Sequence, residues 1–238
     1  MEGIATGIKQ LDSTFNGLKI GKLYCISATS SLERSSLIAK LALGVATRGY
    51  GILLCYLEKS ETSMQSFLYD IYNYYCEYDD NLPALKKREL SMQELGALPI
   101  WIEDFPTLSY SSLLDSLQKI CYLNRHAIDL VIIDNIARMD TDFHVQSKNL
   151  CIEANLYLLK MIAKEYKVPV ITFFELNRVF LAMKPFEESK YIDKIAIFRS
   201  SRDEMPIFNR RGVKIIPTED NLELSIFDEY KRIHVTLG

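Results

Sequence analysis

Hydrophobic positions along the chain follow two alternating patterns. Short apolar runs rich in β-branched residues predict strands over residues 22–28, 51–57, 99–103, 129–134, 168–174, 193–200, 211–217 and 222–228. Between them, apolar residues that recur every three to four positions predict helices over residues 35–48, 109–123 and 150–166. This alternation predicts an α/β fold in which a mostly parallel sheet is flanked by helices. The closely spaced strands at the end predict an antiparallel C-terminal extension.

Several of these segments carry a more specific signal. Residues 129–133 and 170–174 are continuously apolar, which is typical of central strands covered on both faces. Ser109 is the expected N-cap of the helix that follows it. Residues 61–80 are rich in tyrosine and predict an amphipathic helix whose rings cover the sheet or a subunit contact. Base stacking on these rings is the alternative, although the flanking acids would repel a polyanion.

Length and composition restrict the class of protein. The chain has 238 residues, of which 48% are hydrophobic, and we interpret residues 1–238 as a single domain. The net charge of −3 argues against a generally basic nucleic-acid coat but not against a local basic path. We see neither an apolar run long enough for a membrane span nor a secretory signal, so we expect a cytoplasmic protein with no membrane partner.

The cysteines and histidines predict no structural metal. The five cysteines are widely spaced, no CxxC motif occurs, and the three histidines are scattered. Cys25 and Cys55 lie inside apolar strand-like runs, where cysteine behaves as a small buried hydrophobe. We therefore expect free thiols in a reducing compartment.

The first strand–loop–helix junction is where a phosphate ligand would bind. In open parallel sheets ligands lie at the carboxyl ends of strands, and a helix N-terminus there attracts anions. The junction reads ATSSLERSS, and its spacing imitates the phosphate loop GxxxxGK[ST] with Ala28, Glu33 and Arg34 in place of Gly, Gly and Lys. The candidate nucleotide-binding residues are Ala28, Ser31, Glu33, Arg34, Ser35 and Ser36.

Two acids stand at the ends of predicted strands. Asp134 closes the apolar run 129–134, as a Walker B carboxylate that holds Mg²⁺ would. Glu58 follows the second strand, where an acid can orient a water molecule near a γ-phosphate. Either acid could instead be an N-cap or an ion-pair partner.

The chain resembles the RecA-like motor domain of DnaB-type replicative helicases. The resemblance covers nearly the whole chain in order, through TGIKQLDSTFNGLKIGKLYCISA, ATSSLERSS, LCYLEKSETSM, PIWIEDFPTLSYSSLLDSL, DLVIIDNIARM, AKEYKVPVITFFELNR and SRDE. It implies a RecA-like P-loop NTPase fold, ATP-dependent DNA unwinding in replication, and Mg-ATP as cofactor. It also implies single-stranded DNA and replication proteins as partners, and a homo-oligomer that is a hexameric ring in the family. The helicase N-terminal domain and linker helix are expected to be absent.

The resemblance also assigns roles to residues. Glu58 matches the catalytic glutamate, Asp134 the Walker B aspartate, and Ser35 the hydroxyl that binds Mg²⁺, which makes Ser35 and Asp134 the metal ligands. The motif that senses nucleotide and leads into a DNA-binding loop is matched by Glu175, Asn177 and Arg178. The basic run that contains Arg210 and Arg211 is a further candidate for DNA contact, with a solvated hairpin as the alternative.

Departures from the family pattern all act against ATP hydrolysis. Glu33 and Arg34 replace the phosphate-loop Gly-Lys, Glu175 replaces the sensor glutamine, and Glu219 stands near the expected arginine finger. A carboxylate ~5 Å from a phosphate, at an effective dielectric of ~20, adds about 3 kcal/mol of repulsion per unit charge. We expect Arg34 to pair with Glu33, Glu58 or Asp134 and so to fill the phosphate site.

The sequence therefore predicts a degenerate pseudo-ATPase of the helicase-motor type that acts as an assembly or binding module. Mg-ATP binding is expected to be weak or absent. One alternative is a working ATPase and helicase in which Arg34 replaces the phosphate-loop lysine. A second alternative is a nucleotide-free protein that binds single-stranded DNA through the basic run.

Overall fold

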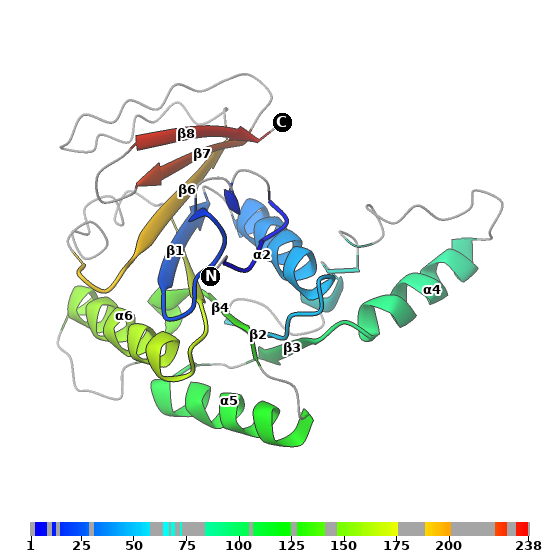
Figure 1. Cartoon of the computed structure of the whole chain (residues 1–238), viewed down its shortest axis with the longest axis horizontal. Coiled ribbons are helices and arrows are strands. Elements are labelled where there is room, and N and C mark those ends of the chain that lie inside the picture. Colours follow the sequence, from blue (N-terminus) through cyan, green and yellow to red (C-terminus); the bar gives the residue numbers. More distant parts are fainter. Residues whose placement is uncertain are drawn as a thin grey trace.

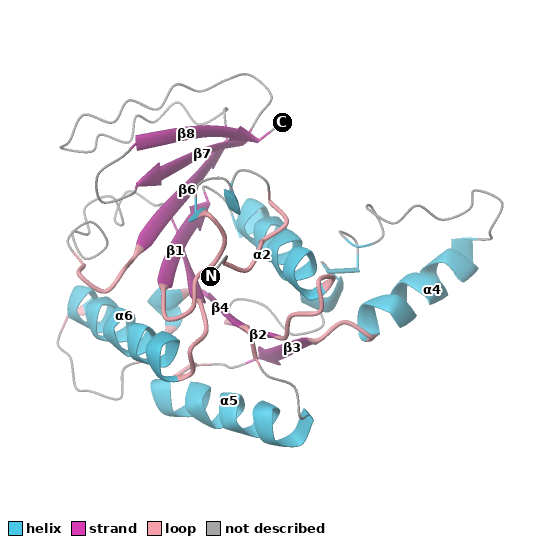
Figure 2. Ribbon diagram, viewed as in Figure 1, coloured by secondary structure: helices cyan, strands magenta, loops and turns pink. Residues whose placement is uncertain are grey.

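A computed structural model of the chain shows one sheet with helices on both of its faces (Figures 1 and 2). It describes residues 3–8, 11–12, 15–28, 31–57, 64–66, 68–69, 72, 84–104, 107–124, 128–140, 147–175, 189–200, 222–227 and 232–237. The strands are β1 (Leu23–Ala28), β2 (Ile52–Tyr56), β3 (Ile100–Asp104), β4 (Leu130–Asp134), β5 (Val170–Glu175), β6 (Lys194–Ser200), β7 (Leu222–Phe227) and β8 (Arg232–Leu237). The helices are α2 (Ser31–Ala46), α4 (Ala84–Gly96), α5 (Tyr110–Asn124), α6 (Lys148–Glu165) and the 3-10 turn η1 (Ile136–Arg138).

The sheet has the order β3-β2-β4-β5-β1-β6-β7-β8. Each neighbouring pair from β3 to β6 is parallel, whereas β6 with β7 and β7 with β8 are antiparallel. The predicted mostly parallel sheet with an antiparallel C-terminal extension is confirmed. Parallel neighbours need crossover connections, and the helices between them supply these.

Two hydrophobic cores lie on opposite faces of the sheet. Ile26 and Leu54 point to the face that α2 covers, whereas Cys25 and Cys55 point to the face that α5 and α6 cover. Successive residues of a strand alternate between faces, so one apolar run supplies both cores. Every residue of β2 and β4 is buried, and so are residues 170–174 of β5. The predictions of doubly covered central strands and of buried Cys25 and Cys55 are confirmed.

The predicted helices are present with shifted ends. Residues 109–123 correspond to α5, and its N-cap is confirmed because Ser109 Oγ accepts a hydrogen bond from Ser112 N at 3.2 Å. Residues 150–166 correspond to α6, where the Ser147 hydroxyl accepts from Leu150 N at 3.3 Å. The helix predicted over 35–48 begins earlier, at Ser31, and ends at Ala46.

Two elements were missed by the pattern. The sequence of α4 carries no clear apolar stripe, which is why the pattern did not predict this helix. In agreement, Ser91 is its one buried residue among those whose side chains the structure describes. The strand β8 was not predicted, although Ile233, Val235 and Leu237 alternate with polar residues, which is a pattern typical of a strand. The strand predicted over 211–217 lies outside the described residues.

The described part of the tyrosine-rich segment contacts both α4 and the core on the α2 side. Met64 and Leu68 are buried in that core, and Tyr72 packs against it. The Tyr72 hydroxyl donates to Glu94 Oε2 at 3.1 Å, and Tyr69 lies under the guanidinium of Arg88, 5.9 Å from its ring centroid. Among the described residues, no helix is long and apolar enough to cross a membrane.

Candidate functional site

The parallel strands bring Ala28, Asp134 and Glu175 to one edge of the sheet. Tyr56 is paired with Asp134 at the ends of β2 and β4, and Ala28 is paired with Glu175 at the ends of β1 and β5. The helix α2 starts beside the same edge, at Ser31. This is the edge at which parallel sheets hold their ligands.

Arg34 forms a buried ion pair with Asp134. The Arg34 Nε lies 2.7 Å from Asp134 Oδ1, and both side chains are 0% exposed. Arg34 is among the largest of the fully buried side chains that the structure describes. The predicted contact between Arg34 and one of the nearby carboxylates is thus confirmed, with Asp134 as the partner.

Ser35 is engaged in a second buried contact. Its Oγ lies 2.9 Å from the Tyr56 hydroxyl, and either group can be the donor. Sequence reasoning missed Tyr56 because it stands in an apolar strand. The available signal was its hydroxyl, since a buried tyrosine usually finds a hydrogen-bond partner.

The segment after Asp134 is also tied down. Asn135 Oδ1 accepts a hydrogen bond from Ala137 N at 2.8 Å and so caps the turn η1. Asn155 of α6 donates its side-chain amide to Met139 O at 3.1 Å. In addition, Leu57 N donates to the Asp134 carbonyl at 2.7 Å. The first two contacts hold the segment after β4, and the third joins the carboxyl ends of β2 and β4.

At the junction between β1 and α2, the helix begins at Ser31, inside the spacing that imitates a phosphate loop. Residues 31–36 are helical, so they do not form an open loop whose amides surround an anion. The physical reason lies in the sequence: no glycine occurs between Ala28 and Ser36, and the residues there have no need of left-handed backbone. The helix can therefore extend towards β1.

The observed contacts engage groups that the resemblance assigns to Mg-ATP. The cation expected to face phosphate is turned into the protein and bound to Asp134, the acid expected to hold Mg²⁺. The hydroxyl expected to bind Mg²⁺ is bound to Tyr56. A nucleotide would have to break the ion pair and separate Ser35 from Tyr56.

The other predicted site residues are only partly described. Ala28 and Glu175 have their backbone at strand ends, and Ser31, Glu33 and Ser36 have theirs in α2, but these side chains are outside the description. The remaining predicted residues lie outside the described part of the chain: Glu58, Asn177, Arg178, Arg210, Arg211 and Glu219. Their roles stay predictions.

Comparison with known proteins identifies relatives of one kind. Residues 3–183 match the family described as DnaB-like helicase C terminal domain. The chain is 24% identical over 189 residues to the replicative DNA helicase DnaB of Leifsonia xyli subsp. xyli, covering 75% of this chain and 40% of that protein. It is 26% identical over 190 residues to a probable replicative DNA helicase of Trieres chinensis, with coverage of 75% and 40%. The matched part therefore spans about 40% of the length of these relatives.

Solved structures show the same fold. One of them, described as an ATPase domain, superimposes with a TM-score of 0.77 at 16% identity, over 98% of this chain and 87% of that one. A DnaB-like replicative helicase, whose structure was described with its interactions with primase, also gives a TM-score of 0.77, at 18% identity. That match covers 98% of this chain and 60% of the helicase. The predicted RecA-like fold is confirmed.

Proposed function

Because the chain belongs to the DnaB-like helicase C-terminal domain family, we propose that it is a helicase-motor domain that works as an assembly or binding module without ATP hydrolysis. The observation that supports this proposal is the buried pair of Arg34 and Asp134. The pair joins the residues that a working site would use to bind phosphate and Mg²⁺, so each of these residues is already bound to the other.

The energy of this pair is large enough to matter for ligand binding. Leaving one member of a buried ion pair without its partner costs about 3–5 kcal/mol. A phosphate without Mg²⁺ that drew Arg34 away from Asp134 would have to offset a cost of this size, which corresponds to roughly 10²–10⁴-fold in affinity. A bound Mg²⁺ would give Asp134 a new partner and so lower this cost. The repulsion that the sequence predicts between Glu33 and a phosphate would add to this cost.

Titration calorimetry with Mg-ATP tests the proposal. We expect no binding tighter than about 100 μM. A hydrolysis assay, run with and without single-stranded DNA, should show no turnover above that of an Asp134→Ala variant. Low-micromolar binding together with DNA-stimulated turnover would contradict the proposal and favour a working ATPase in which Arg34 serves as the phosphate-loop cation.

A second experiment restores the family residues at the junction. The change Glu33→Gly with Arg34→Lys removes the carboxylate, allows left-handed backbone and returns a compact ammonium to the phosphate site. We expect nucleotide binding to recover while hydrolysis stays slow, because Glu175 and Glu219 are unchanged. Arg34→Lys alone is the matched control and should bind less tightly than the double variant. Equal failure of both would place the defect outside the junction.

We propose a replication complex as the setting in which this module acts. Support comes from the helicase relatives and from the structural neighbour described with its interactions with primase. A homo-oligomer is part of the proposal because the family forms rings. Light scattering of the purified chain, alone and with a primase, tests both parts.

A further inference from the structure

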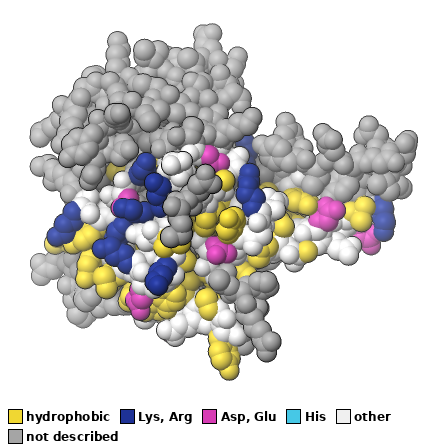
Figure 3. Space-filling view, in the orientation of Figure 1, with side chains coloured by type: hydrophobic (Ala, Val, Ile, Leu, Met, Phe, Trp, Pro, Cys, Tyr) yellow, Lys and Arg dark blue, Asp and Glu magenta, His cyan; other side chains and the backbone are white. Residues whose placement is uncertain are grey.

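The helix α6 presents an apolar stripe to solvent. Leu150 is 55% exposed, Tyr157 44% and Met161 40%, and their spacing of seven and four residues places them on one side of the helix. The buried residues of α6, such as Leu156 and Leu159, lie on its opposite side and pack in the core. Figure 3 shows hydrophobic side chains at the surface where α6 lies in Figure 1, with charged side chains beside them. The described part of the chain thus leaves this face of the helix uncovered.

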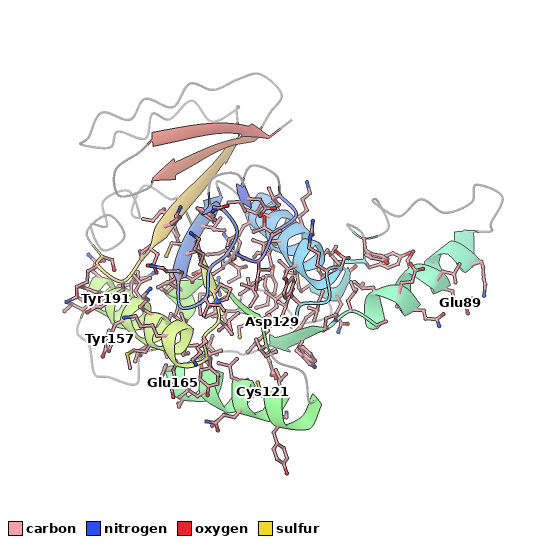
Figure 4. The ribbon with its side chains drawn as sticks, viewed as in Figure 1. Glu89, Cys121, Asp129, Tyr157, Glu165 and Tyr191 are labelled. Atoms are coloured by element: carbon pink, nitrogen blue, oxygen red, sulfur yellow. The ribbon has the colours of Figure 1, made fainter. Side chains whose placement is uncertain are left out.

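A second aromatic ring holds the centre of this stripe in place. The rings of Tyr157 and Tyr191 have centroids 5.2 Å apart and are tilted by 58°, and Figure 4 shows the two residues side by side. Tyr191 is half-buried, and Lys190 Nζ lies 5.3 Å from the centroid of its ring. A ring that is already ordered loses little conformational entropy when a partner covers it. The stripe is therefore suited to binding without rearrangement.

Two exposed charges, one of each sign, border the stripe. Glu153 lies towards the N-terminal end of α6 and Lys164 towards its C-terminal end, and neither pairs with another residue in the described part of the chain. They are about 16 Å apart along the helix axis, which is too far for them to pair within the helix. Lys160 stands between them, but its ammonium is bound to the Gly21 carbonyl at 2.8 Å and to Asp193. We call this surface the outer α6 face, and it comprises Leu150, Glu153, Tyr157, Met161 and Lys164.

The order of charges on the outer α6 face is complementary to its own reverse. If two copies of α6 lie antiparallel, Glu153 of each copy is directed to the half of the other helix that carries Lys164. Parallel copies would instead place like charges near each other, which is unfavourable. The remaining exposed charges of the helix, Lys148 and Glu165, stand at its two ends and have opposite signs, so they also favour the antiparallel arrangement.

We propose that a second copy of this chain covers the outer α6 face, with the two α6 helices antiparallel around a two-fold axis. The apolar residues are spaced as those of paired helices are, so the side chains of the two copies can interdigitate. Another protein with an amphipathic helix would meet the same stripe, but the charge order favours the second copy as the occupant. The contact goes beyond the proposed function, since it involves no residue of the Arg34–Asp134 site.

The first test is the oligomeric state as a function of concentration. One helix face per copy lies at the low end of the areas that specific interfaces bury, so we expect a dimer that dissociates at micromolar concentrations. Sedimentation velocity of the full chain at roughly 1–200 μM follows the change from a 27.4 kDa species to one of twice that mass. We expect half-dissociation between about 5 and 100 μM. A wild-type chain that stays monomeric up to about 200 μM would overturn the proposal.

Charge reversal tests the antiparallel arrangement. Glu153→Lys and Lys164→Glu should each weaken the dimer by about tenfold, because each replaces two attractive contacts across the axis with two repulsive ones. The double variant carries both changes, restores the complementarity and should dimerise within about threefold of the wild type. Asp115→Lys, which reverses an exposed carboxylate of α5, is the matched control. Failure of the double variant to recover, or an equal loss in the control, would refute the proposed contact.

Removal of the central ring tests the apolar part of the contact. Tyr157→Ser should weaken the dimer by about tenfold or more, whereas Tyr122→Ser, at a tyrosine that is 85% exposed on α5, should leave it unchanged. A higher oligomer that persists in all these variants would be a ring built from other surfaces and would overturn the role of the outer α6 face. Mg-ATP should not change the dimer. Binding of Mg-ATP by a chain that dimerises as expected would contradict only the proposed loss of nucleotide binding.

Discussion

Arg34 is a cation that the fold has taken out of water completely. Its side chain is 0% exposed, which is tolerable only because Asp134, also 0% exposed, lies 2.7 Å away. Such a pair contributes little net stability compared with apolar residues of similar size, but each member strongly depends on the other. A change at either residue alone therefore leaves a buried charge without its partner.

A double-mutant cycle measures this dependence. Arg34→Met and Asp134→Leu should each lower the free energy of unfolding by about 3–5 kcal/mol, because each leaves one buried charge unpaired. The double variant should lose much less than the sum of the two, since no charge remains. Urea denaturation gives the three values. Additivity of the single losses within about 0.5 kcal/mol would show that the two side chains do not interact.

Asp193 predicts a specific response of stability to acid. Burial acts to raise the pKa of Asp193, but the hydrogen bonds from Lys160 and Lys22 outweigh it and hold the pKa below its usual value. A carboxyl whose pKa is lowered by folding stabilises the protein above its unfolded pKa of about 3.9. That stability is lost as the pH falls from about 3.9 through the folded pKa.

Asp193→Asn tests this expectation. At neutral pH the variant should be less stable by about 1.5–3 kcal/mol, the usual worth of hydrogen bonds to a charged group. The difference from the wild type should shrink below about pH 4, where the carboxyl becomes protonated in the unfolded state and then, at lower pH, in the folded state. Asp115→Asn, which changes an exposed carboxylate of α5, is the matched control. A difference that stays constant down to about pH 2 would refute the assigned role.

Between elements, α2 and the N-terminal segment approach each other closely at Gly44. A Cβ at Gly44 would lie 2.2 Å from the carbonyl oxygen of Thr6. The N-terminal segment is itself held, because Thr6 N donates to Asp12 Oδ1 at 2.6 Å and Ile4 pairs with Leu18. Glycine is thus required at this point of α2 by packing, although glycine weakens helices in general.

Gly44→Ala should destabilise the protein by about 1–3 kcal/mol, as overpacking of a tight contact does. The matched control is Gly96→Ala in α4, where a Cβ would meet nothing within 4 Å. The control should be neutral or stabilised by up to about 1 kcal/mol, because alanine favours helix. Thermal and urea denaturation of both variants give the comparison. A stabilised Gly44→Ala variant would mean that the N-terminal segment does not pack on α2 in solution.

At the scale of the whole molecule, the sheet separates two cores, and the buried thiols report on one of them. Cys25 of β1 and Cys55 of β2 belong to the core on the α5 and α6 side. Burial raises the pKa of both thiols well above the ordinary value, which suppresses the reactive thiolate. By contrast, Cys121 is exposed on α5.

Thiol labelling at about pH 8 should therefore distinguish them. Iodoacetamide should modify Cys121 in the native protein, whereas Cys25 and Cys55 should be modified at the rate at which the whole sheet opens. Peptide mass mapping at intervals, with and without urea, follows each site. Labelling of Cys55 as fast as that of Cys121 without urea would contradict the packing of the core.

Local pattern was sufficient to predict most elements, and it failed where the apolar signal was weak. The burial of β2 and β4 and the N-cap Ser109 were predictable because strand alternation, helix period and capping depend on neighbours in sequence. The helix α4 carries too few regularly spaced apolar residues for such a signal, whereas the alternation of Ile233, Val235 and Leu237 in β8 was available and was overlooked. The early start of α2 was missed because the phosphate-loop spacing suggested a loop where no glycine supports one.

By itself, the sequence determined the family, the α/β alternation and the presence of a cation at position 34, which had several carboxylates as possible partners. Only the tertiary structure decided that Asp134 is the partner and that Ser35 meets Tyr56. It also decided that Lys22, Lys160 and Asp193 meet. The physical reason is that strand order and helix placement bring these groups together across long stretches of chain. Packing and desolvation determine which buried charges pair with each other. The local sequence pattern does not contain this information.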